Sequence, residues 1–484
     1  MDVEKLSSLD LSFLDLEDAG TPMHVGAVLL FRAATDVPDG SGAQRLAAVL
    51  RARVATVPRL RRRLARPVLG PAAWVEDTDF DPERHVLCAA LPAIGSREEL
   101  ASRAAELLAA PLDRGHPLWE LHVIAGSVDD SVVVLAKIHH ALADGLRAVV
   151  LGLALFDDLG NCARHDQPLQ VDAPAPDVPF TGPAGWLTRT IGDLLAPARL
   201  LLDPRTAPGK LARQAGQVRD ATRISASVAQ SLMRPAPASP LNISPRAVRR
   251  FTTLNGDPAG PSRQVAMLRL DLDDVHRVSK THGGTVNDVL LTVVAGGLRC
   301  WMDGRGQPPH RPLRALVPVS RRHPDPGDTA GNRLSGYLVE LPVHEPDPLR
   351  RLHTIRAAMT ANKANGQTRG PGAFPLLANL LPPPLHRLAA PIVTPLAAPI
   401  ASRLFNTVIT QVPLPDLGFT MAGARLTEIY PVAPLAAGQA LAVAISTYQR
   451  VAHIGLHVDQ VAIPDIDRLG DHLAAALAEL VDID

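Results

Sequence analysis

Residues 131–145, SVVVLAKIHHALADG, constrain the fold of this chain more than any other stretch. The apolar run at its start predicts a buried strand, and two adjacent histidines, His139 and His140, stand where that strand ends. Asp144 and Gly145 then open a helical pattern. An imidazole held at the end of a rigid strand suits general-base chemistry near neutral pH. A core histidine followed by a helix-capping aspartate is the alternative, purely structural reading of the same residues.

The length and composition of the chain narrow its class. A length of 484 residues predicts two lobes, because single hydrophobic cores stop growing at about 250–300 residues. Basic and acidic residues both number 49, so the net charge gives no reason to expect nucleic acid as a partner. Three scattered cysteines without metal-ligand spacing indicate a reducing cytoplasm. We see neither a signal peptide nor an apolar run long enough to span a membrane, so any membrane contact is expected to be peripheral.

The first lobe, residues 1–165, carries further candidate site residues. Two apolar runs around a short Gly/Asp turn predict a β-hairpin that brings Trp119 close to the His pair. Trp119 is read first as a packing residue, with ligand contact as the alternative. Glu17 lies between a short helix and a buried strand and reads, taken alone, as a loop acid. An arginine-rich helical pattern over residues 43–66 provides either phosphate-binding side chains or a solvated face.

The composition changes after the first lobe. Residues 166–250 predict a proline-rich and basic connector, in which Trp and Leu recur at helical intervals. Such a basic amphipathic helix lies either on a membrane or on its parent domain, and the pattern favours neither. The second lobe, residues 251–484, contains a long apolar helix that begins near Asn287 and Asp288. Thr285 and Asp288 have the spacing of a capping box, and a polar helix start can also donate to an anionic oxygen.

Four motifs, in the same order along nearly the whole chain, resemble those of bacterial wax ester synthases/diacylglycerol acyltransferases. They are His139-His140-x-x-x-Asp144-Gly145, Pro117-Leu118-Trp119-Glu120, Asn287-Asp288, and an N-terminal set of Leu9-Asp10, Phe13-Leu14, Glu17 and Pro22-Met23-His24-Val25-Gly26. The resemblance implies an α/β fold of two chloramphenicol-acetyltransferase-like lobes, each a mixed sheet flanked by helices. These lobes would form a pseudo-dimer around a substrate tunnel.

The resemblance also implies an activity and roles for individual residues. The expected enzyme is an O-acyltransferase that moves a long-chain fatty acyl group from acyl-CoA to diacylglycerol, to a long-chain alcohol, or to both. His140 would be the general base, with His139 beside it. Asp144 would hold the motif through a salt bridge to an arginine, for which Arg314 and Arg321 are the candidates. Motif residues expected near the site are Gly145, Glu17, Trp119, Asp288 and Asn287, the last as a candidate oxyanion donor together with backbone N–H groups.

No cofactor and no metal are expected, with acyl-CoA acting as a substrate. Adjacent strand residues point to opposite faces, so His139 and His140 would rarely bind one ion. We also find no Gly-x-Ser-x-Gly nucleophile elbow and no cysteine beside the His pair, which favours direct transfer in a ternary complex. The expected location is the cytoplasm, peripherally on the inner face of the membrane or on lipid droplets.

One segment departs from the family pattern, and two other functions stay open. Similar proteins carry Ser/Thr-Asn-Val-Pro-Gly-Pro late in the second lobe, whereas residues 410–415 read TQVPLP. Gln411 replaces asparagine and Leu414 replaces a conformationally permissive glycine, so the tunnel wall and the substrate preference are expected to differ. The alternatives are an acyltransferase or condensation-type enzyme that uses a carrier-protein thioester, and a non-catalytic lipid-binding protein of the same fold.

Overall fold

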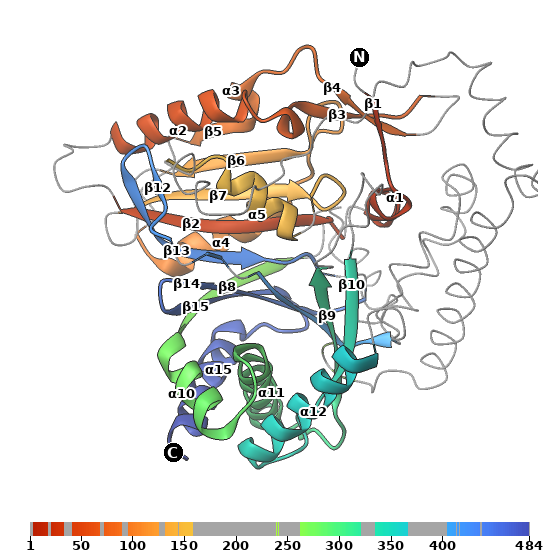
Figure 1. Cartoon of the computed structure of the whole chain (residues 1–484), viewed down its shortest axis with the longest axis vertical. Helices are drawn as coiled ribbons and strands as arrows, with labels where there is room; N and C mark the ends of the chain where they lie inside the picture. Colours follow the sequence, from red (N-terminus) through yellow and green to blue (C-terminus); the bar gives the residue numbers. More distant parts are fainter. Residues whose placement is uncertain are drawn as a thin grey trace, which may run out of the picture.

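The structure of the protein is a computed structural model. This structure describes residues 3–17, 21–32, 41–67, 72–89, 95–124, 131–143, 145–157, 239, 241, 262–320, 334–365, 404–412, 414–415, 417–435 and 438–483. These residues form two six-stranded sheets, one three-stranded sheet and the helices that cover them. Figure 1 shows the two large sheets in separate lobes, one above the other. The predicted two-lobed α/β architecture is confirmed.

The sheet of the first lobe has the strand order β12-β13-β2-β7-β6-β5. Its strands are β2 (His24–Arg32), β5 (Val86–Ala89), β6 (Trp119–Ile124), β7 (Ser131–His139), β12 (Thr420–Met421) and β13 (Ala424–Val432). Strands β6 and β7 pair antiparallel with Trp119 opposite Ile138, which confirms the predicted hairpin. Strand β2 runs antiparallel to β7 on its other side and places His24 opposite His139.

Helices cover both faces of this sheet. They are α1 (Ser8–Leu16), α2 (Ser41–Val54), α3 (Pro82–His85), α4 (Arg97–Ala109) and α5 (Gly145–Leu153), and a small sheet of β1 (Val3–Lys5), β4 (Ala73–Glu76) and β3 (Arg62–Ala65) lies beside them. The apolar side chains of α2 pack in one core with Phe31 and Val134, whereas those of α4 pack in another with Val28 and Leu135. Because β2 and β7 alternate, these two cores lie on opposite faces of the sheet.

The predicted helix over residues 43–66 is wrong in its second half. Helix α2 ends at Val54, a 3₁₀ turn covers Pro58–Arg61, and β3 follows directly. Proline has no backbone N–H and disfavours the helical conformation of the residue before it, so Pro58 breaks the helical pattern. Helix α1 begins after its N-cap Ser7, which pairs with Asp10 in a capping box.

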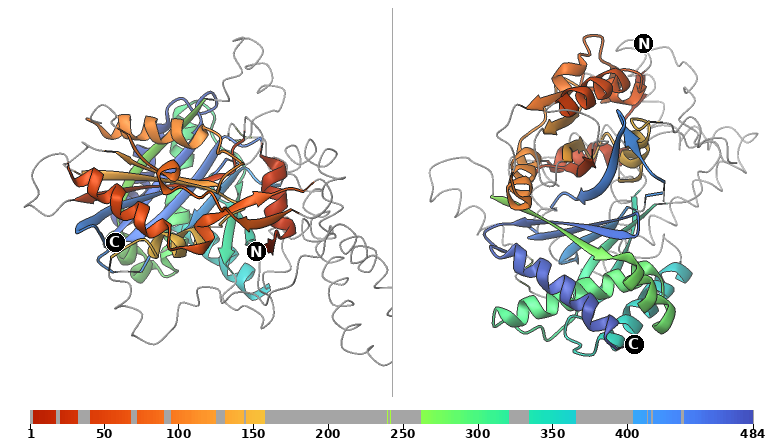
Figure 2. Two further views of the ribbon diagram at one scale, coloured as in Figure 1. Left: turned by 90° about the horizontal axis from the view of Figure 1, so that it is seen from above. Right: turned by 90° about the vertical axis from the view of Figure 1, so that its left-hand side faces the viewer.

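The second lobe has the strand order β10-β9-β11-β14-β15-β8. Its strands are β8 (Arg263–Asp271), β9 (Leu313–Ser320), β10 (Leu334–Leu341), β11 (Thr407–Gln411), β14 (Leu441–Tyr448) and β15 (Val451–Asp459), and its helices are α10 (Leu272–His282), α11 (Val286–Gly304), α12 (Pro348–Asn365) and α15 (Ile466–Val481). Figure 2 shows these helices on the side of the sheet that faces away from the first lobe. The predicted capping box of Thr285 and Asp288 begins α11 and is confirmed.

Strand β13 links the two halves of the chain. It lies in the sequence of the second half but pairs with β2 of the first sheet, from Arg425 opposite Arg32 to Val432 opposite Gly26. No strand was predicted between residues 416 and 441. Strand β13 also passes very close to β15, where a Cβ added to Gly455 would lie 2.0 Å from the carbonyl oxygen of Pro431. Glycine is therefore required at 455 for the two lobes to dock at this distance.

We expect Gly455→Ala to destabilise the protein by at least about 2 kcal/mol, because the new methyl group meets backbone that has to move. Chemical denaturation measures this loss. Gly470→Ala is the matched control, since nothing lies within 4 Å of its Cβ on helix α15. That change is expected to stabilise by about 1 kcal/mol through helix propensity. Equal stability of Gly455→Ala and the wild type would contradict the requirement for close docking.

Glu428 on β13 gathers charged groups from both lobes. Arg97 at the start of α4 donates to its two oxygens at 2.8 and 2.9 Å, and Arg269 on β8 donates to Oε1 at 3.2 Å. The Tyr430 hydroxyl donates to Oε2 at 2.5 Å. Burial alone raises the pKa of Glu428, but the hydrogen bonds from Arg97 and Tyr430 outweigh it and lower the pKa to about 2. The ionised carboxylate therefore joins the two lobes.

The lowered pKa of Glu428 predicts a pH dependence of folding. A carboxyl whose pKa falls on folding from 4.5 to about 2 contributes about 3 kcal/mol of stability. This contribution is complete above the unfolded pKa and is lost as the pH falls from about 4.5 towards 2. We expect the stability difference between the wild type and Glu428→Gln to shrink over this interval in denaturation series at stepped pH. A difference that is constant from pH 6 to pH 2 would argue against the ionised clamp.

Several predictions lie outside the described residues. They are the connector 166–250 (apart from Ser239 and Leu241), the motif residue Asp144, and Arg321. Among the helices that the structure does describe, none combines the length and the apolar character needed to cross a membrane.

Candidate active site

The His pair lies at the end of β7, where the sheet holds its backbone on both sides. The His139 N–H donates to the Leu118 carbonyl at 3.0 Å, and the His140 N–H donates to the Met23 carbonyl at 2.8 Å. His139 is the last residue of β7, and its side chain is almost completely buried. Neighbouring residues of a strand point to opposite faces, so the two imidazoles have different surroundings.

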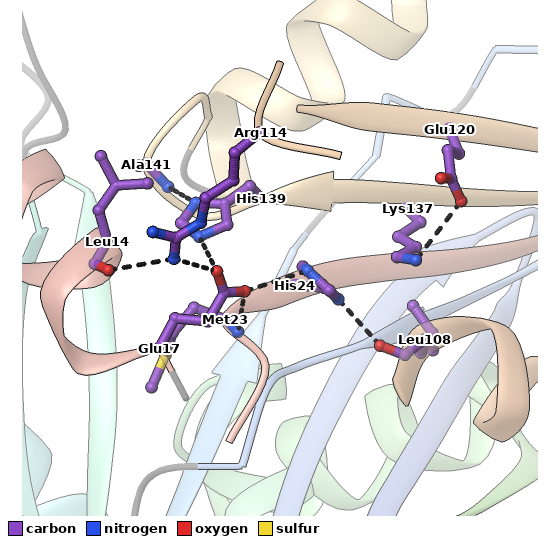
Figure 3. A network of polar contacts seen from close by, with 10 residues as sticks. All are labelled: Leu14, Glu17, Met23, His24, Leu108, Arg114, Glu120, Lys137, His139 and Ala141. Carbon is purple, nitrogen blue, oxygen red and sulfur yellow. Dashed lines mark hydrogen bonds and ion pairs between the residues drawn. The ribbon is translucent and has the colours of Figure 1, made fainter. Parts of the chain in front are cut away.

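His139 faces the carboxylate of Glu17, which follows α1 (Figure 3). Oε2 of Glu17 lies 3.3 Å from His139 Nε2 and 2.6 Å from Nη2 of Arg114. Oε1 lies 3.2 Å from His24 Nε2 and accepts the Met23 N–H at 3.3 Å. One carboxylate thus joins the ends of β2 and β7 to the loop after α4. Glu17, read alone as a loop acid, lies at the centre of a polar network.

The hydrogen bonds of this network fix the proton on His139. Its Nδ1 accepts the Ala141 N–H at 3.0 Å, which leaves the proton of the neutral ring on Nε2, facing Glu17. Burial lowers the pKa of His139, and the nearby Glu17 offsets this only in part. For Glu17 itself, burial raises the pKa, but contacts with His139, His24 and Arg114 outweigh it and hold the pKa well below its usual range. At neutral pH the network therefore contains a neutral His139 and an ionised Glu17.

His24 is held from its other side by α4. Its Nδ1 lies 2.9 Å from the carbonyl oxygen of Leu108, so this nitrogen donates, while Nε2 faces Glu17. On the same face of β7, the fully buried Lys137 lies 3.4 Å from Glu120. Burial lowers the pKa of Lys137, and Glu120 partly offsets this shift.

His140 packs against α1. Its ring stacks on Phe13 with the centroids 4.0 Å apart and the planes 23° apart. The side chain is only partly buried, in contrast to that of His139. Of the two imidazoles, that of His140 is therefore the one that is partly exposed.

An apolar cavity opens beside the motif, on the face of the sheet opposite to His139. It encloses about 1070 Å³ of space, its open mouth included, and Ile138 and Gly145, which bracket the His pair in sequence, both line it. Val412, Leu414 and Ser446 of the second lobe complete the wall. Among the described lining residues, Ser446 carries the only hydroxyl group, and the others are apolar side chains, glycines or Trp119. The cavity suits an alkyl chain.

Trp119 combines the two roles that the sequence left open. The ring lines the cavity, is almost completely buried, and stacks on His85 with the centroids 4.6 Å apart. Its Nε1–H donates to the Leu60 carbonyl at 2.7 Å, so the polar atom is satisfied within the protein. Trp119 therefore packs the lobe and forms part of the cavity wall.

The structure does not bring every predicted site residue to the His pair. Asp288 is engaged in the cap of α11, and no described hydrogen bond or ion pair joins Asp288 or Asn287 to either histidine. Arg314 donates to the Leu404 carbonyl in the second lobe, and the structure does not describe its proposed partner Asp144.

Arg114 was not predicted as a site residue, and His24 and Phe13 were expected only as members of a family motif. No sequence pattern relates His24 to His139, because the two residues come together only through the pairing of β2 with β7. No sequence pattern relates Glu17 to Arg114, which follows it by 97 residues. Leu414, at which a departure from the family pattern was expected to alter the tunnel wall, lines the cavity.

We expect Glu17→Gln to destabilise the protein by about 1–3 kcal/mol at neutral pH, because it removes the largely buried carboxylate that His24, His139 and Arg114 contact. Denaturation curves measure the loss. Glu106→Gln is the matched control, since the Glu106 side chain is 61% exposed in its pair with Arg103, and a change within about 0.5 kcal/mol is expected. Similar losses in the two variants would show that the Glu17 network is not structural.

Comparison with known protein families and relatives identifies the family of this chain. Residues 6–290 match the wax ester synthase/diacylglycerol acyltransferase catalytic domain, and residues 330–481 match the WS/DGAT C-terminal domain. The chain is 32% identical over 486 residues to a Mycobacterium tuberculosis protein named as a diacylglycerol O-acyltransferase, covering 99% of this chain and 96% of that one. A second M. tuberculosis protein of the same designation is 31% identical over 491 residues, covering 99% and 90%.

Solved structures agree as well. The wax ester synthase/diacylglycerol acyltransferase from Marinobacter aquaeolei VT8 superposes with a TM-score of 0.66 at 26% identity over 98% of both chains. A trichothecene 15-O-acetyltransferase from Fusarium sporotrichioides shares the fold, with a TM-score of 0.59 at 11% identity over 99% and 95% of the chains. The chain therefore belongs to the wax ester synthase/diacylglycerol acyltransferase family and is an acyltransferase.

Proposed function

We propose that this enzyme transfers a long-chain fatty acyl group from acyl-CoA to the hydroxyl of diacylglycerol or of a long-chain alcohol. The observation that carries the proposal is the position of the His pair, whose flanking residues Ile138 and Gly145 line a large apolar cavity. The names of the relatives support the same pair of acceptors. The reaction needs no cofactor, because the thioester is itself the activated acyl donor.

The two histidines receive different roles. Both nitrogens of His139 are engaged, one with the Ala141 N–H and one with Glu17, so His139 positions the end of β7. His140 is the general base, and its stacking on Phe13 orients the ring. This division follows from their opposite directions on the strand.

The proposed reaction is a direct transfer. His140 takes the proton of the acceptor hydroxyl while that oxygen attacks the thioester carbonyl carbon, and a tetrahedral oxyanion forms. Asn287 or a backbone N–H would donate to this oxyanion. The carbon–sulfur bond then breaks, the ester leaves, and the CoA thiolate takes the proton from His140. No side chain of the protein becomes acylated.

His140→Ala is expected to lower the rate of CoA release from palmitoyl-CoA by about 10²–10⁴-fold, because general-base catalysis is lost. Dioleoylglycerol and hexadecanol are offered as separate acceptors, and the thiol is measured colorimetrically. His310→Ala replaces an exposed histidine of the second lobe and should leave the rate unchanged. A near-normal rate in His140→Ala, with the fold intact by circular dichroism, would refute the assignment of the base.

The wild-type protein tests the function itself. Acceptor-dependent CoA release by the wild type supports acyl transfer, and the faster acceptor identifies the preferred product. No release with either acceptor would contradict the proposal. Turnover that appears only with an acylated phosphopantetheinyl carrier would instead establish a carrier-protein thioester as the donor.

We further propose that the enzyme works in the cytoplasm, peripherally on the inner membrane face or on lipid droplets. Both acceptors partition into lipid, and the basic composition of the connector 166–250 suits an anionic surface. Co-sedimentation with vesicles of anionic phospholipid is the test. Equal sedimentation with and without vesicles would contradict the proposal.

A further inference from the structure

A single buried hydroxyl interrupts the apolar wall of the cavity. Ser446 lies on β14, its side chain is 1% exposed, and its Oγ faces no hydrogen-bond partner among the described residues. The same residue lines the apolar cavity, where it is the only described residue with a hydroxyl group. A buried hydroxyl without a partner is costly, so its retention here points to a ligand.

Ser446 stands close to the end of the cavity where the motif lies. The Val412 N–H donates to the carbonyl of Ile445, the residue before Ser446, at 2.8 Å. Val412 in turn reaches to within 3.6 Å of the position where a Cβ on Gly145 would lie. Gly145, Val412 and Ser446 therefore form one continuous part of the wall. The hydroxyl belongs to the part of the cavity in which the reacting groups of a lipid substrate would lie.

The polar groups near Ser446 do not satisfy its hydroxyl. His453 pairs with Ser446 across β14 and β15, so both side chains lie on the same face of the sheet, yet no hydrogen bond joins them. Burial lowers the pKa of His453 to about 4, and its neutral ring packs edge-on against Tyr430 at 5.1 Å. The charged groups on the Tyr430 side, Arg97 and Arg269, are bound to Glu428.

We propose that Ser446 Oγ donates a hydrogen bond to a carbonyl oxygen of the bound lipid. A carbonyl oxygen that enters an apolar cavity loses its water partners, and a hydroxyl in the wall restores one. Two lipid carbonyls qualify: the thioester carbonyl of acyl-CoA, and an ester carbonyl of diacylglycerol. A long-chain alcohol has no carbonyl. The inference rests on the proposed function and names a contact within it.

The test compares kcat/KM of Ser446→Ala and Ser446→Thr with the wild type, using palmitoyl-CoA with dioleoylglycerol or with hexadecanol. Ser446→Ala removes the donor, and a loss of roughly 5- to 100-fold is expected. Ser446→Thr keeps a hydroxyl in a residue that strands favour, and is expected to retain most of the activity. Val134→Ala enlarges the same cavity without changing a polar atom. Its loss of kcat/KM therefore measures the effect of enlargement alone.

The acceptors distinguish the two carbonyls. A loss with dioleoylglycerol alone assigns the contact to the ester carbonyl, and an equal loss with both acceptors that Ser446→Thr restores assigns it to the thioester carbonyl. The inference is overturned if Ser446→Ala loses no more activity than Val134→Ala, or if Ser446→Thr loses as much as Ser446→Ala.

Thermal unfolding separates binding from a structural role. Because the hydroxyl has no described partner in the protein, Ser446→Ala is expected to unfold at the same or a higher temperature than the wild type. A lower unfolding temperature would contradict the inference. If the wild type releases no CoA with either acceptor, the proposed function fails. If the wild type is active and the Ser446 variants match it, only this inference fails.

Discussion

The pairing of β13 with β2 is the constraint on which the rest of the structure depends. It places a strand from the second half of the chain inside the first sheet, so the two halves of the chain share backbone hydrogen bonds. The close crossing at Gly455 and the charge cluster at Glu428 both lie along this strand. A cavity wall built from both lobes is possible only because the lobes are joined in this way.

The end of β7 shows how one strand serves two purposes. Its alternate side chains divide between buried polar contacts, of His139 with Glu17 and of Lys137 with Glu120, and an apolar cavity wall that includes Ile138. The network fixes the strand end through an ionised Glu17, whereas the cavity face contributes no charge. One face of β7 thus fixes the end of the strand, and the opposite face lines the apolar cavity. His140 is the first residue after this strand.

Local patterns accounted for much of the fold. The hairpin of β6 and β7 and the capping box at Thr285 follow from periodicity and spacing within short segments. The helix expected over residues 43–66 failed because Pro58 outweighs the surrounding arginine-rich pattern. Strand β13 was missed, because its sequence carries no sign that its partner is a strand almost 400 residues earlier.

The sequence by itself determined that two histidines end a strand, that a helix follows them, and that the chain carries the family's motifs. These are properties of neighbouring residues, and the geometry of the backbone converts their spacing directly into position. Only the tertiary structure decided that Glu17 meets His139, His24 and Arg114, and that Ser446 enters the cavity. Such meetings depend on strand register and on the docking of the lobes, which arise from the packing of the whole chain and leave no local pattern.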